Sequence, residues 1–188
     1  MFEDRPAVRV PIFTTKVFWP RIVLATALAL ALSTFSPTQA NTLVIGQTAP
    51  PITLTTLDGK QIDTHDLRGK VVIVTFWATW CQPCREELPL LSRYARDHAQ
   101  QGLVVLGFSL NTPDELDQVR AAAGTLSFPV GLLGDPHVQG YGRIWRLPVS
   151  FTIDRKGRLV DDGWKDDSAA WTVIRLEQVI TPLLNQEY

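Results

Sequence analysis

Residues 77–84 read Trp-Ala-Thr-Trp-Cys-Gln-Pro-Cys and contain both cysteines of the chain. The run Val71–Trp77 before them is continuously β-branched or aromatic, which is typical of a strand buried on both faces. After them, apolar residues recur at helical spacing over Leu88–His98, and Pro83 suits the first turn of a helix, where its missing N–H costs nothing. The two thiols are therefore predicted at a strand-to-helix junction, with Cys81 at the helix N-terminus.

This location predicts the chemistry of the two thiols. Unpaired N–H groups and the positive end of the helix dipole stabilise a thiolate at Cys81. In Cys-x-x-Cys sites of this kind the thiol pKa falls from about 8.5 to about 3.5–7.5. Cys81 is therefore predicted to be the nucleophile. Cys84, one turn further along, is predicted to be the resolving thiol that attacks a mixed disulfide and releases reduced substrate.

Other uses of a Cys-x-x-Cys pair fit this sequence less well. A structural zinc site takes four ligands, and beyond the cysteines the chain offers only the scattered His65, His98 and His137. Covalent haem attachment requires a histidine directly after the second cysteine, where this chain has Arg85. A purely structural disulfide across two residues would remove little entropy from the unfolded chain. We therefore expect a redox-active disulfide, with no metal and no other cofactor.

Residues 1–40 are predicted to be a signal peptide or an N-terminal membrane anchor. Met1–Arg21 has a net side-chain charge of +2, and Ile22–Phe35 is a 14-residue uncharged stretch rich in Ala and Leu. That length suits the apolar region of a signal peptide better than a full membrane span. The imperfect cleavage pattern Thr38-Gln39-Ala40 favours cleavage before Asn41, while retention as an anchor stays open. In both cases the basic segment stays cytoplasmic and the rest is exported.

Residues 41–188 have the length of one globular domain. They carry 14 Lys and Arg against 17 Asp and Glu, so no basic face suggests nucleic acid. An oxidising compartment normally favours structural disulfides, yet only one cysteine pair is present. The exported part is therefore more suited to exchanging disulfides than to being held together by one, and we expect it to be a monomer.

The elements around the cysteines follow an α/β order. A strand at 52–55 followed by the turn signal Asp58-Gly59 predicts an N-terminal β-hairpin. Leu103–Ser109 is a second buried strand, and strand, helix and strand with short joins make a right-handed βαβ unit with parallel strands. The helix between them is expected to reach Gln101 and to stop at Gly102.

Downstream, Thr112 is expected to cap a helix that ends near Ala123, with Glu115 closing a capping box. Phe128–Leu133 is predicted to be a short strand. The stretch Asp135–Arg143 is predicted to be an interrupted helix, weakened by its two glycines.

At the C-terminal end, Val149–Ile153 and Arg158–Val160 predict an antiparallel hairpin. Ser168 is expected to cap a last helix. The residues expected to cover one sheet face are Trp171, Ile174, Val179 and Leu183. The predicted fold class is α/β with a thioredoxin-like order: a central mixed β-sheet flanked by helices, with an N-terminal β-hairpin extension.

With these elements in place, the chain resembles the TlpA/ResA-like branch of exported thioredoxin-fold thiol:disulfide oxidoreductases over residues 41–188. The resemblance rests on Val71–Trp77 leading into Trp80–Cys84, on Arg85–Pro89 and on Leu147–Phe151. By this resemblance, the two cysteines are the redox pair.

The resemblance also implies substrate-binding residues. Pro148 is expected to be a cis-proline beside the redox pair, although cis is a minority state of X–Pro bonds and a trans edge proline is the alternative. The backbone of Leu147 would then be exposed for pairing with an extended substrate. Trp80 and Pro83 are expected to contact substrate as well.

Glu87 matches a carboxylate that lies under the active site in this branch. It follows Cys84 by three residues, which places both near one helical face. If desolvated, its pKa would rise and it could exchange a proton with the buried thiol. Ordinary thioredoxins have a buried Asp where this chain has Thr75, which leaves Glu87 as the expected relay. The alternative is a solvated helix position like that of Glu86.

The leading hypothesis is an extracytoplasmic reductant of disulfides in exported proteins. By resemblance, its electrons would come from a membrane thiol donor, and its target could be the cysteine pair of an apocytochrome c. A dithiol oxidant is the rival enzyme. A peroxiredoxin fits less well, because Val74 and Ala78 replace the Pro and Thr of the Pro-x-x-x-Thr-x-x-Cys pattern. A copper- or haem-handling thiol chaperone lacks a Met-rich stretch, since Met1 is the only methionine.

Overall fold

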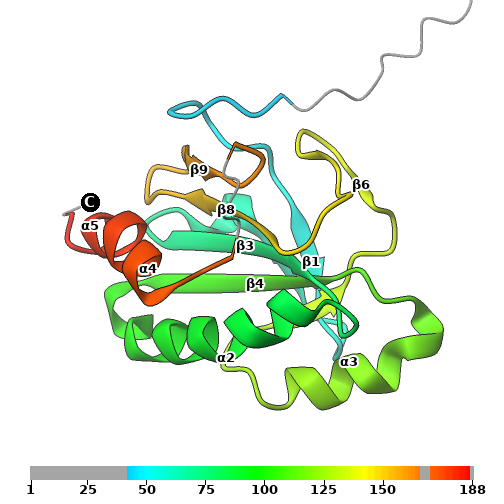
Figure 1. Ribbon diagram of the computed structural model, residues 1–188. Helices are drawn as coiled ribbons and strands as arrows, with labels where there is room; N and C mark the ends of the chain where they lie inside the picture. The colour runs from blue at the N-terminus through cyan, green and yellow to red at the C-terminus, as the bar shows by residue number, and fades with distance from the viewer. Residues whose placement is uncertain (1–41, 166–169, 187–188) are drawn as a thin grey trace, which may run out of the picture. The chain divides into compact units, whose positions relative to one another are not determined.

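A five-stranded mixed sheet forms the centre of the computed structural model, which describes residues 42–165 and 170–186. Its strands are β3 (Val71–Trp77), β4 (Leu103–Ser109), β5 (Val130–Leu132), β8 (Val149–Ile153) and β9 (Leu159–Asp162). They lie in the order β5-β4-β3-β8-β9 (Figure 1). The pairs β3–β4 and β4–β5 are parallel, and β8 is antiparallel to both β3 and β9. The predicted parallel unit and C-terminal hairpin are confirmed.

The central strand β3 is buried along its whole length, as its apolar run predicted. Its side chains alternate between the two faces of the sheet, so Val71 and Ile73 join one hydrophobic cluster while Val72 and Val74 join the other. The strand is apolar on both sides because each face is covered by other parts of the chain.

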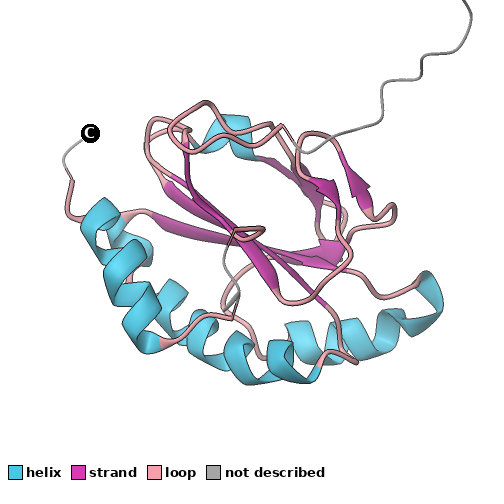
Figure 2. Cartoon of the chain, turned by 45° about the horizontal axis from the view of Figure 1, so that its top comes forward, coloured by secondary structure: helices cyan, strands magenta, loops and turns pink. Residues whose placement is uncertain are grey.

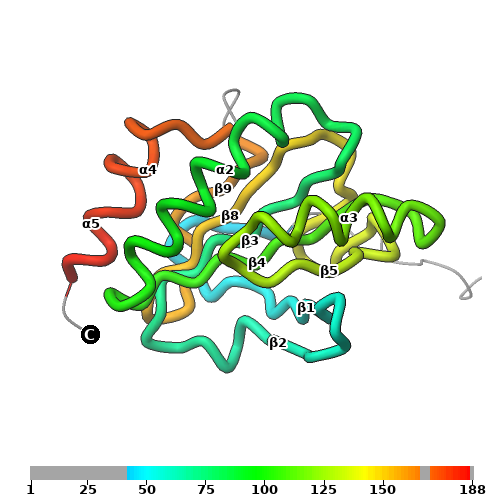
Figure 3. Tube along the Cα trace, turned by 90° about the horizontal axis from the view of Figure 1, so that it is seen from below, coloured from blue at the N-terminus to red at the C-terminus, as the bar shows by residue number. Residues whose placement is uncertain are grey.

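The α-helices of the described residues cover one face of the sheet (Figures 2 and 3). They are α2 (Gln82–Asp97), α3 (Leu116–Ala123), α4 (Val173–Val179) and α5 (Thr181–Leu184). Buried residues of all four belong to the cluster that contains Val71 and Ile73. The opposite cluster includes Leu43, Leu54 and Tyr141, so the N-terminal segment and the loops cover the other face.

The first helix ends close to its predicted boundary. The α-helical part of α2 stops at Asp97, and a 3-10 turn, Ala99–Gln101, continues it to Gly102. Gly102 has a φ of 87°, a left-handed conformation that glycine adopts without steric cost. Gly102 therefore ends the helical segment as predicted.

The predicted N-terminal hairpin is present as β1 (Thr53–Thr55) and β2 (Gln61–Asp63), which pair antiparallel. A short 3-10 helix, Thr64–Leu67, follows β2. The helix after β4 begins with a 3-10 turn, Pro113–Glu115, that leads into α3. In the predicted capping box, the Thr112 N–H donates to the Glu115 carboxylate over 2.9 Å.

The prediction of an interrupted helix over Asp135–Arg143 was wrong. This stretch forms two short antiparallel strands, β6 (His137–Val138) and β7 (Gly142–Arg143). Gly140 and Gly142 have φ values of 80° and 83°, which an α-helix does not allow. Gly140 therefore lies in the hairpin turn, and Gly142 begins β7.

The C-terminal helix also differs from the prediction. Ser168, the predicted cap, lies outside the described residues, and the cap of α4 is Thr172, whose hydroxyl accepts the Arg175 N–H at 3.1 Å. The buried residues of this region are Leu176 of α4, Ile180 between the two helices and Leu184 of α5. Of the four residues expected on the sheet face, Trp171 is buried ahead of the helix and Val179 and Leu183 are partly buried. Ile174 is 66% exposed.

The segment 42–49 lies along the outer edge of β9. The Gly46 N–H donates to the Leu159 carbonyl at 2.8 Å, and Thr48 forms a bridge with Arg158. The predicted signal peptide or anchor at residues 1–40 lies outside the described residues. Within residues 42–165 and 170–186, the structure has no helix that is both long and apolar enough to cross a membrane.

Candidate active site

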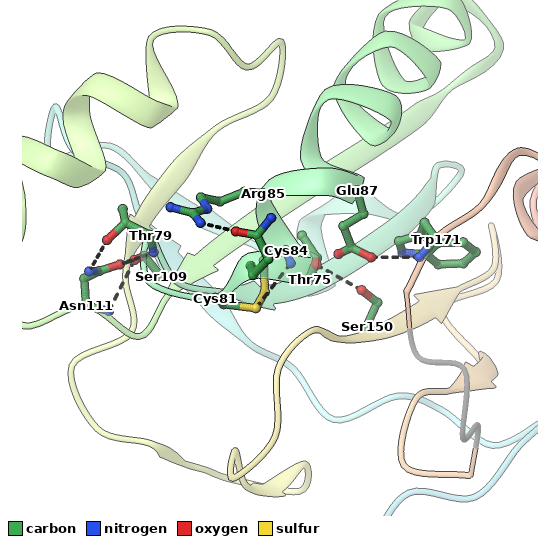
Figure 4. Close-up of a disulfide and its surroundings, with 11 residues drawn as sticks. Thr75, Thr79, Cys81, Cys84, Arg85, Glu87, Ser109, Asn111, Ser150 and Trp171 are labelled. Atoms are coloured by element: carbon green, nitrogen blue, oxygen red, sulfur yellow. Dashed lines mark hydrogen bonds between the residues drawn. A yellow bond between two sulfur atoms is a disulfide. The ribbon is translucent and has the colours of Figure 1, made fainter.

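The two cysteines form a disulfide where β3 turns into α2 (Figure 4). Cys81 is the N-cap of α2, and its sulfur accepts the backbone N–H of Cys84 at 3.2 Å. The Cα atoms of the two cysteines are 5.3 Å apart. The N-terminal N–H groups of the helix therefore face Cys81 in the way that stabilises a thiolate.

The two sulfur-bearing residues differ in access to solvent. Cys81 keeps an exposed fraction of 6%, while Cys84 is completely buried. The neighbouring Trp80 is 60% exposed, so the surface beside Cys81 is open. This difference is what a nucleophile at Cys81 and a resolving thiol at Cys84 require.

A buried amide, which the sequence reasoning missed, holds the loop before Cys81. The Asn111 side-chain oxygen accepts the Thr79 N–H at 2.9 Å and the Ser109 hydroxyl at 2.8 Å. Its amide nitrogen donates to the Thr79 hydroxyl at 2.7 Å and to the Glu115 carboxylate at 3.1 Å. Asn111 therefore ties the active-site loop to Ser109 at the end of β4 (Figure 4). Through Glu115 it also ties this loop to the start of α3.

Glu87 is buried on α2, three residues after Cys84, with only 3% of its surface exposed. Its Oε2 accepts the backbone N–H of Trp171 at 2.7 Å, and its Oε1 has no hydrogen-bond partner among the described residues. Burial raises the pKa of the carboxyl to about 7, against the opposing effects of the Trp171 N–H and the Arg175 charge. The alternative of a solvated helix position is therefore wrong. The role of Glu87 in proton transfer stays a prediction.

Arg175 and Thr75 complete the surroundings of this carboxyl. The Arg175 guanidinium binds the Asp161 carboxylate at 2.9 Å and lies 4.2 Å from the centre of the Trp171 ring. Thr75 is buried in β3, and its hydroxyl accepts the Ser150 hydroxyl at 2.9 Å. A hydroxyl thus occupies the place of the carboxylate that ordinary thioredoxins have there.

A groove of about 480 Å³ runs past Cys81. Trp80 and Pro83 line it on the side of α2, and Trp145 and Leu147 come from the segment before β8. The predicted substrate-binding residues Trp80, Pro83 and Leu147 thus meet at one groove. Trp145, which is 71% exposed, is a further lining residue that sequence reasoning missed.

The peptide bond between Leu147 and Pro148 is cis, as predicted. Pro148 itself is buried, so Leu147 is the member of the pair that reaches the groove. A larger hollow of about 650 Å³ lies between the β1–β2 hairpin and α3, lined by Lys60, Arg120 and Phe128 among others. It contains no cysteine, so the chemistry points to the smaller groove at Cys81.

The part of the chain that the structure describes has no cluster of three or more His, Cys, Asp or Glu side chains placed to hold a metal ion. The three histidines lie in separate parts of the fold: His65 is in the 3-10 helix after β2, His98 follows α2 and His137 is in β6. The arrangement at the disulfide, with Cys81 at a helix N-terminus and Cys84 fully buried, is that of a dithiol exchange site.

Comparison with known proteins agrees with this geometry. Residues 45–161, more than half of the chain, match the AhpC/TSA family. The thiol-disulfide oxidoreductase ResA of Bacillus anthracis is 32% identical over 117 residues, which cover 62% of this chain and 68% of ResA. The thioredoxin-like protein YneN of Bacillus subtilis is 36% identical over 124 residues, covering 62% of this chain and 69% of YneN.

Solved structures show the same fold. The thioredoxin domain of a thiol-disulfide oxidoreductase from Bacteroides vulgatus is 29% identical with a TM-score of 0.55, covering 68% of this chain and 93% of that domain. A thiol:disulfide interchange protein of the thioredoxin family from Chlorobium tepidum is 24% identical with a TM-score of 0.59, covering 74% and 97% of the two chains. The protein thus belongs to the AhpC/TSA family, as a thiol-disulfide oxidoreductase of the ResA type with a thioredoxin-like fold and one Cys81–Cys84 pair.

Proposed function

We propose that this protein reduces disulfides of exported proteins outside the cytoplasm, with Cys81 as the nucleophile and Cys84 as the resolving thiol. The observation that carries the proposal is the placement of the pair: Cys81 borders an open groove at a helix N-terminus, and Cys84 is buried. This placement presents one sulfur to a substrate and keeps the other for the second step.

The exchange proceeds in two steps. The Cys81 thiolate attacks one sulfur of the substrate disulfide, forming a mixed disulfide and releasing the first substrate thiolate, which takes up a proton. The Cys84 thiol then loses its proton, attacks the Cys81 sulfur and releases the second substrate thiol. Two electrons and two protons pass to the substrate, and the protein is left with the Cys81–Cys84 disulfide. A dithiol donor at the membrane must then return two electrons.

Glu87 is the group that we assign to the second step. Its carboxyl has a pKa of about 7, so it can both accept and donate a proton near neutral pH. It lies three residues after Cys84 on the same helix, and Thr75 offers no carboxylate as an alternative. Glu87 would accept the Cys84 proton as the mixed disulfide is resolved.

An extracytoplasmic location is supported by the N-terminal sequence, where a basic segment precedes the 14-residue apolar stretch Ile22–Phe35. A fusion of residues 1–45 to a reporter that is active only after export tests this proposal. An inactive reporter that is expressed intact would contradict it.

The proposed substrate is the cysteine pair of an apocytochrome c, whose haem-attachment motif is Cys-x-x-Cys-His. The experiment mixes the reduced protein with an oxidised peptide that carries this motif and measures the thiols released. The proposal expects two substrate thiols per oxidised protein molecule. A Cys84→Ser variant should stop at a mixed disulfide through Cys81. If the oxidised protein instead oxidises the reduced peptide, the protein is a dithiol oxidant.

A further inference from the structure

Trp145 presents a large aromatic ring to solvent at the groove that is also lined by Cys81. It is 71% exposed, and Trp80, which also lines this groove, is 60% exposed. Both rings line the groove that contains Cys81. Large exposed apolar surfaces of this kind mark interaction sites more often than single scattered residues do.

The Trp145 ring is held in place from behind. It stacks on Trp164 with ring centres 5.8 Å apart and an interplanar angle of 8°. The Arg146 guanidinium lies 5.8 Å from the Trp145 ring centre and 5.7 Å from that of Trp164, and it donates to the Gly163 carbonyl. Such cation–π and stacking contacts restrict an exposed ring before any ligand arrives.

Trp164 is itself anchored to the fold. Its indole N–H donates to the Tyr141 carbonyl at 2.8 Å, and its ring contacts Phe151 of β8 edge to face, with centres 5.8 Å apart. The exposed Trp145 ring therefore rests on a fixed support. A fixed ring loses little conformational entropy when it binds a partner, which favours tight contact.

The proposed disulfide exchange at Cys81 indicates that the substrate chain occupies this groove. A substrate sulfur must reach the Cys81 sulfur, so the chain that carries it has to lie in the groove lined by Trp80 and Trp145. Its backbone would run past Leu147, and a neighbouring side chain would meet the two indole rings. The groove volume of about 480 Å³ lies within the range of about 300–1,000 Å³ that is common for ligand pockets.

We propose that Trp145 is a specificity-determining residue, which selects extended peptide disulfides that carry an aromatic or large aliphatic side chain next to the cysteine. This inference rests on the proposed function of the Cys81–Cys84 site. Trp80 lines the same groove, so a substrate side chain in the groove meets two exposed aromatic surfaces. Small hydrophilic side chains gain little from this arrangement because they bury little apolar area.

The test compares two peptide disulfides that differ only in the residue next to one cysteine, which is Phe in one peptide and Ser in the other. The quantity measured is the ratio of kcat/KM for the Phe peptide to that for the Ser peptide. In wild type the ratio should be about tenfold or more, and Trp145→Ala should reduce it by about tenfold, mainly through KM. Trp145→Phe should keep most of the preference, because it keeps an aromatic wall.

The matched control is Ile174→Ala, which removes a similarly exposed apolar side chain that does not line the groove. The ratio of kcat/KM for the Phe peptide to that for the Ser peptide should be the same in Ile174→Ala as in wild type. Trp145→Gln is a second variant with a polar side chain, and it should lose the preference as Trp145→Ala does. A ratio near one in wild type, or an unchanged ratio in both Trp145→Ala and Trp145→Gln, overturns the inference.

The outcomes separate this inference from the proposed function. If wild type reduces both peptides at equal rates, the selective role of Trp145 is wrong and the reductase proposal stands. If wild type reduces neither peptide, the proposed function fails, and the inference fails with it.

Discussion

The Trp171 backbone N–H donates to Glu87 Oε2 over 2.7 Å and joins the C-terminal segment to the helix that begins at the disulfide. This bond satisfies one carboxyl oxygen and leaves the other without a partner among the described residues. The carboxyl is therefore fixed in position, yet it remains free to take up or release a proton.

Replacing Glu87 by Gln should slow resolution of the mixed disulfide. The amide keeps the volume and can still accept the Trp171 N–H, but it cannot accept a proton from Cys84. General acid–base groups contribute about 10²- to 10⁴-fold, and we expect the low end because a thiol is already partly ionised near neutral pH. The measurement follows release of the second substrate thiol between pH 6 and 9. A rate within about twofold of wild type throughout would show that water serves Cys84 instead.

The free energy of unfolding of the oxidised protein should fall as the pH rises from 4.5 to about 7, because the Glu87 carboxyl loses its proton in this range. Burial raises its folded-state pKa from 4.5 to about 7, so the folded protein binds more protons than the unfolded chain between these values. The Glu87 carboxyl makes its full contribution to the free energy of unfolding below about pH 4.5. This contribution is lost by about pH 7, which lowers the free energy of unfolding by about 3 kcal/mol.

The measurement is urea unfolding of oxidised wild type and Glu87→Gln at pH 4 and pH 8. Because the amide carries no charge at either pH, the variant should gain stability relative to wild type at pH 8. An equal difference between the two proteins at both pH values would show that the Glu87 carboxyl titrates as it does in the unfolded chain.

In the reduced protein, Cys81 should react with an alkylating reagent before Cys84. A thiol whose pKa is lowered to about 7 is half ionised at pH 7, against about 3% for an ordinary thiol, which gives a rate advantage of roughly tenfold or more. Burial of Cys84 adds to the difference. Peptide mapping after brief labelling at pH 7 identifies the labelled residue. Faster labelling of Cys84 would reverse the assigned roles.

Replacing Asn111 by Ala should loosen the active-site loop. The change removes four hydrogen bonds and leaves the Thr79 N–H and the Ser109 hydroxyl without that partner. The expected loss in the free energy of unfolding is about 2–3 kcal/mol, because unsatisfied buried groups cost about 1–3 kcal/mol each. Reduction of a disulfide substrate should slow as well.

The control for this change is Gln118→Ala, which removes an exposed side chain that contacts the same Thr79 hydroxyl at 3.3 Å. It should change stability by no more than about 0.5 kcal/mol. If Asn111→Ala is no more destabilising than Gln118→Ala, the buried amide does not hold the loop.

The parts of the fold that could be predicted are those in which the sequence of the element itself indicates its structure. The apolar runs Val71–Trp77 and Leu103–Ser109 match their strands to the residue, because both are buried between two covered faces. The stretch Asp135–Arg143 was misassigned, since the left-handed conformations of its glycines outweigh a weak helical pattern. The last helix was placed too early because Thr172, and not an earlier residue, caps it.

The residues of the candidate site also fall into those that the local sequence indicates and those that meet only in the folded chain. Cys81 and Cys84 form a local motif that the sequence reveals, and Glu87 was indicated only by the family resemblance. Asn111 is 32 residues from Thr79, and no local pattern indicates that the two side chains meet. Trp145 gains its position from Trp164, which follows it by 19 residues and lies on the far side of a hairpin. Contacts of this kind depend on the folded sheet.

The midpoint potential of the Cys81–Cys84 pair tests the central claim, that this site works as a reductant, most directly. The measurement equilibrates the protein with glutathione or dithiothreitol buffers and follows the fraction of disulfide. We expect a midpoint potential closer to the roughly −270 mV of thioredoxin-type reductants than to the roughly −120 mV of strong dithiol oxidants. A value near −120 mV would contradict this claim and would identify the protein as a source of disulfides.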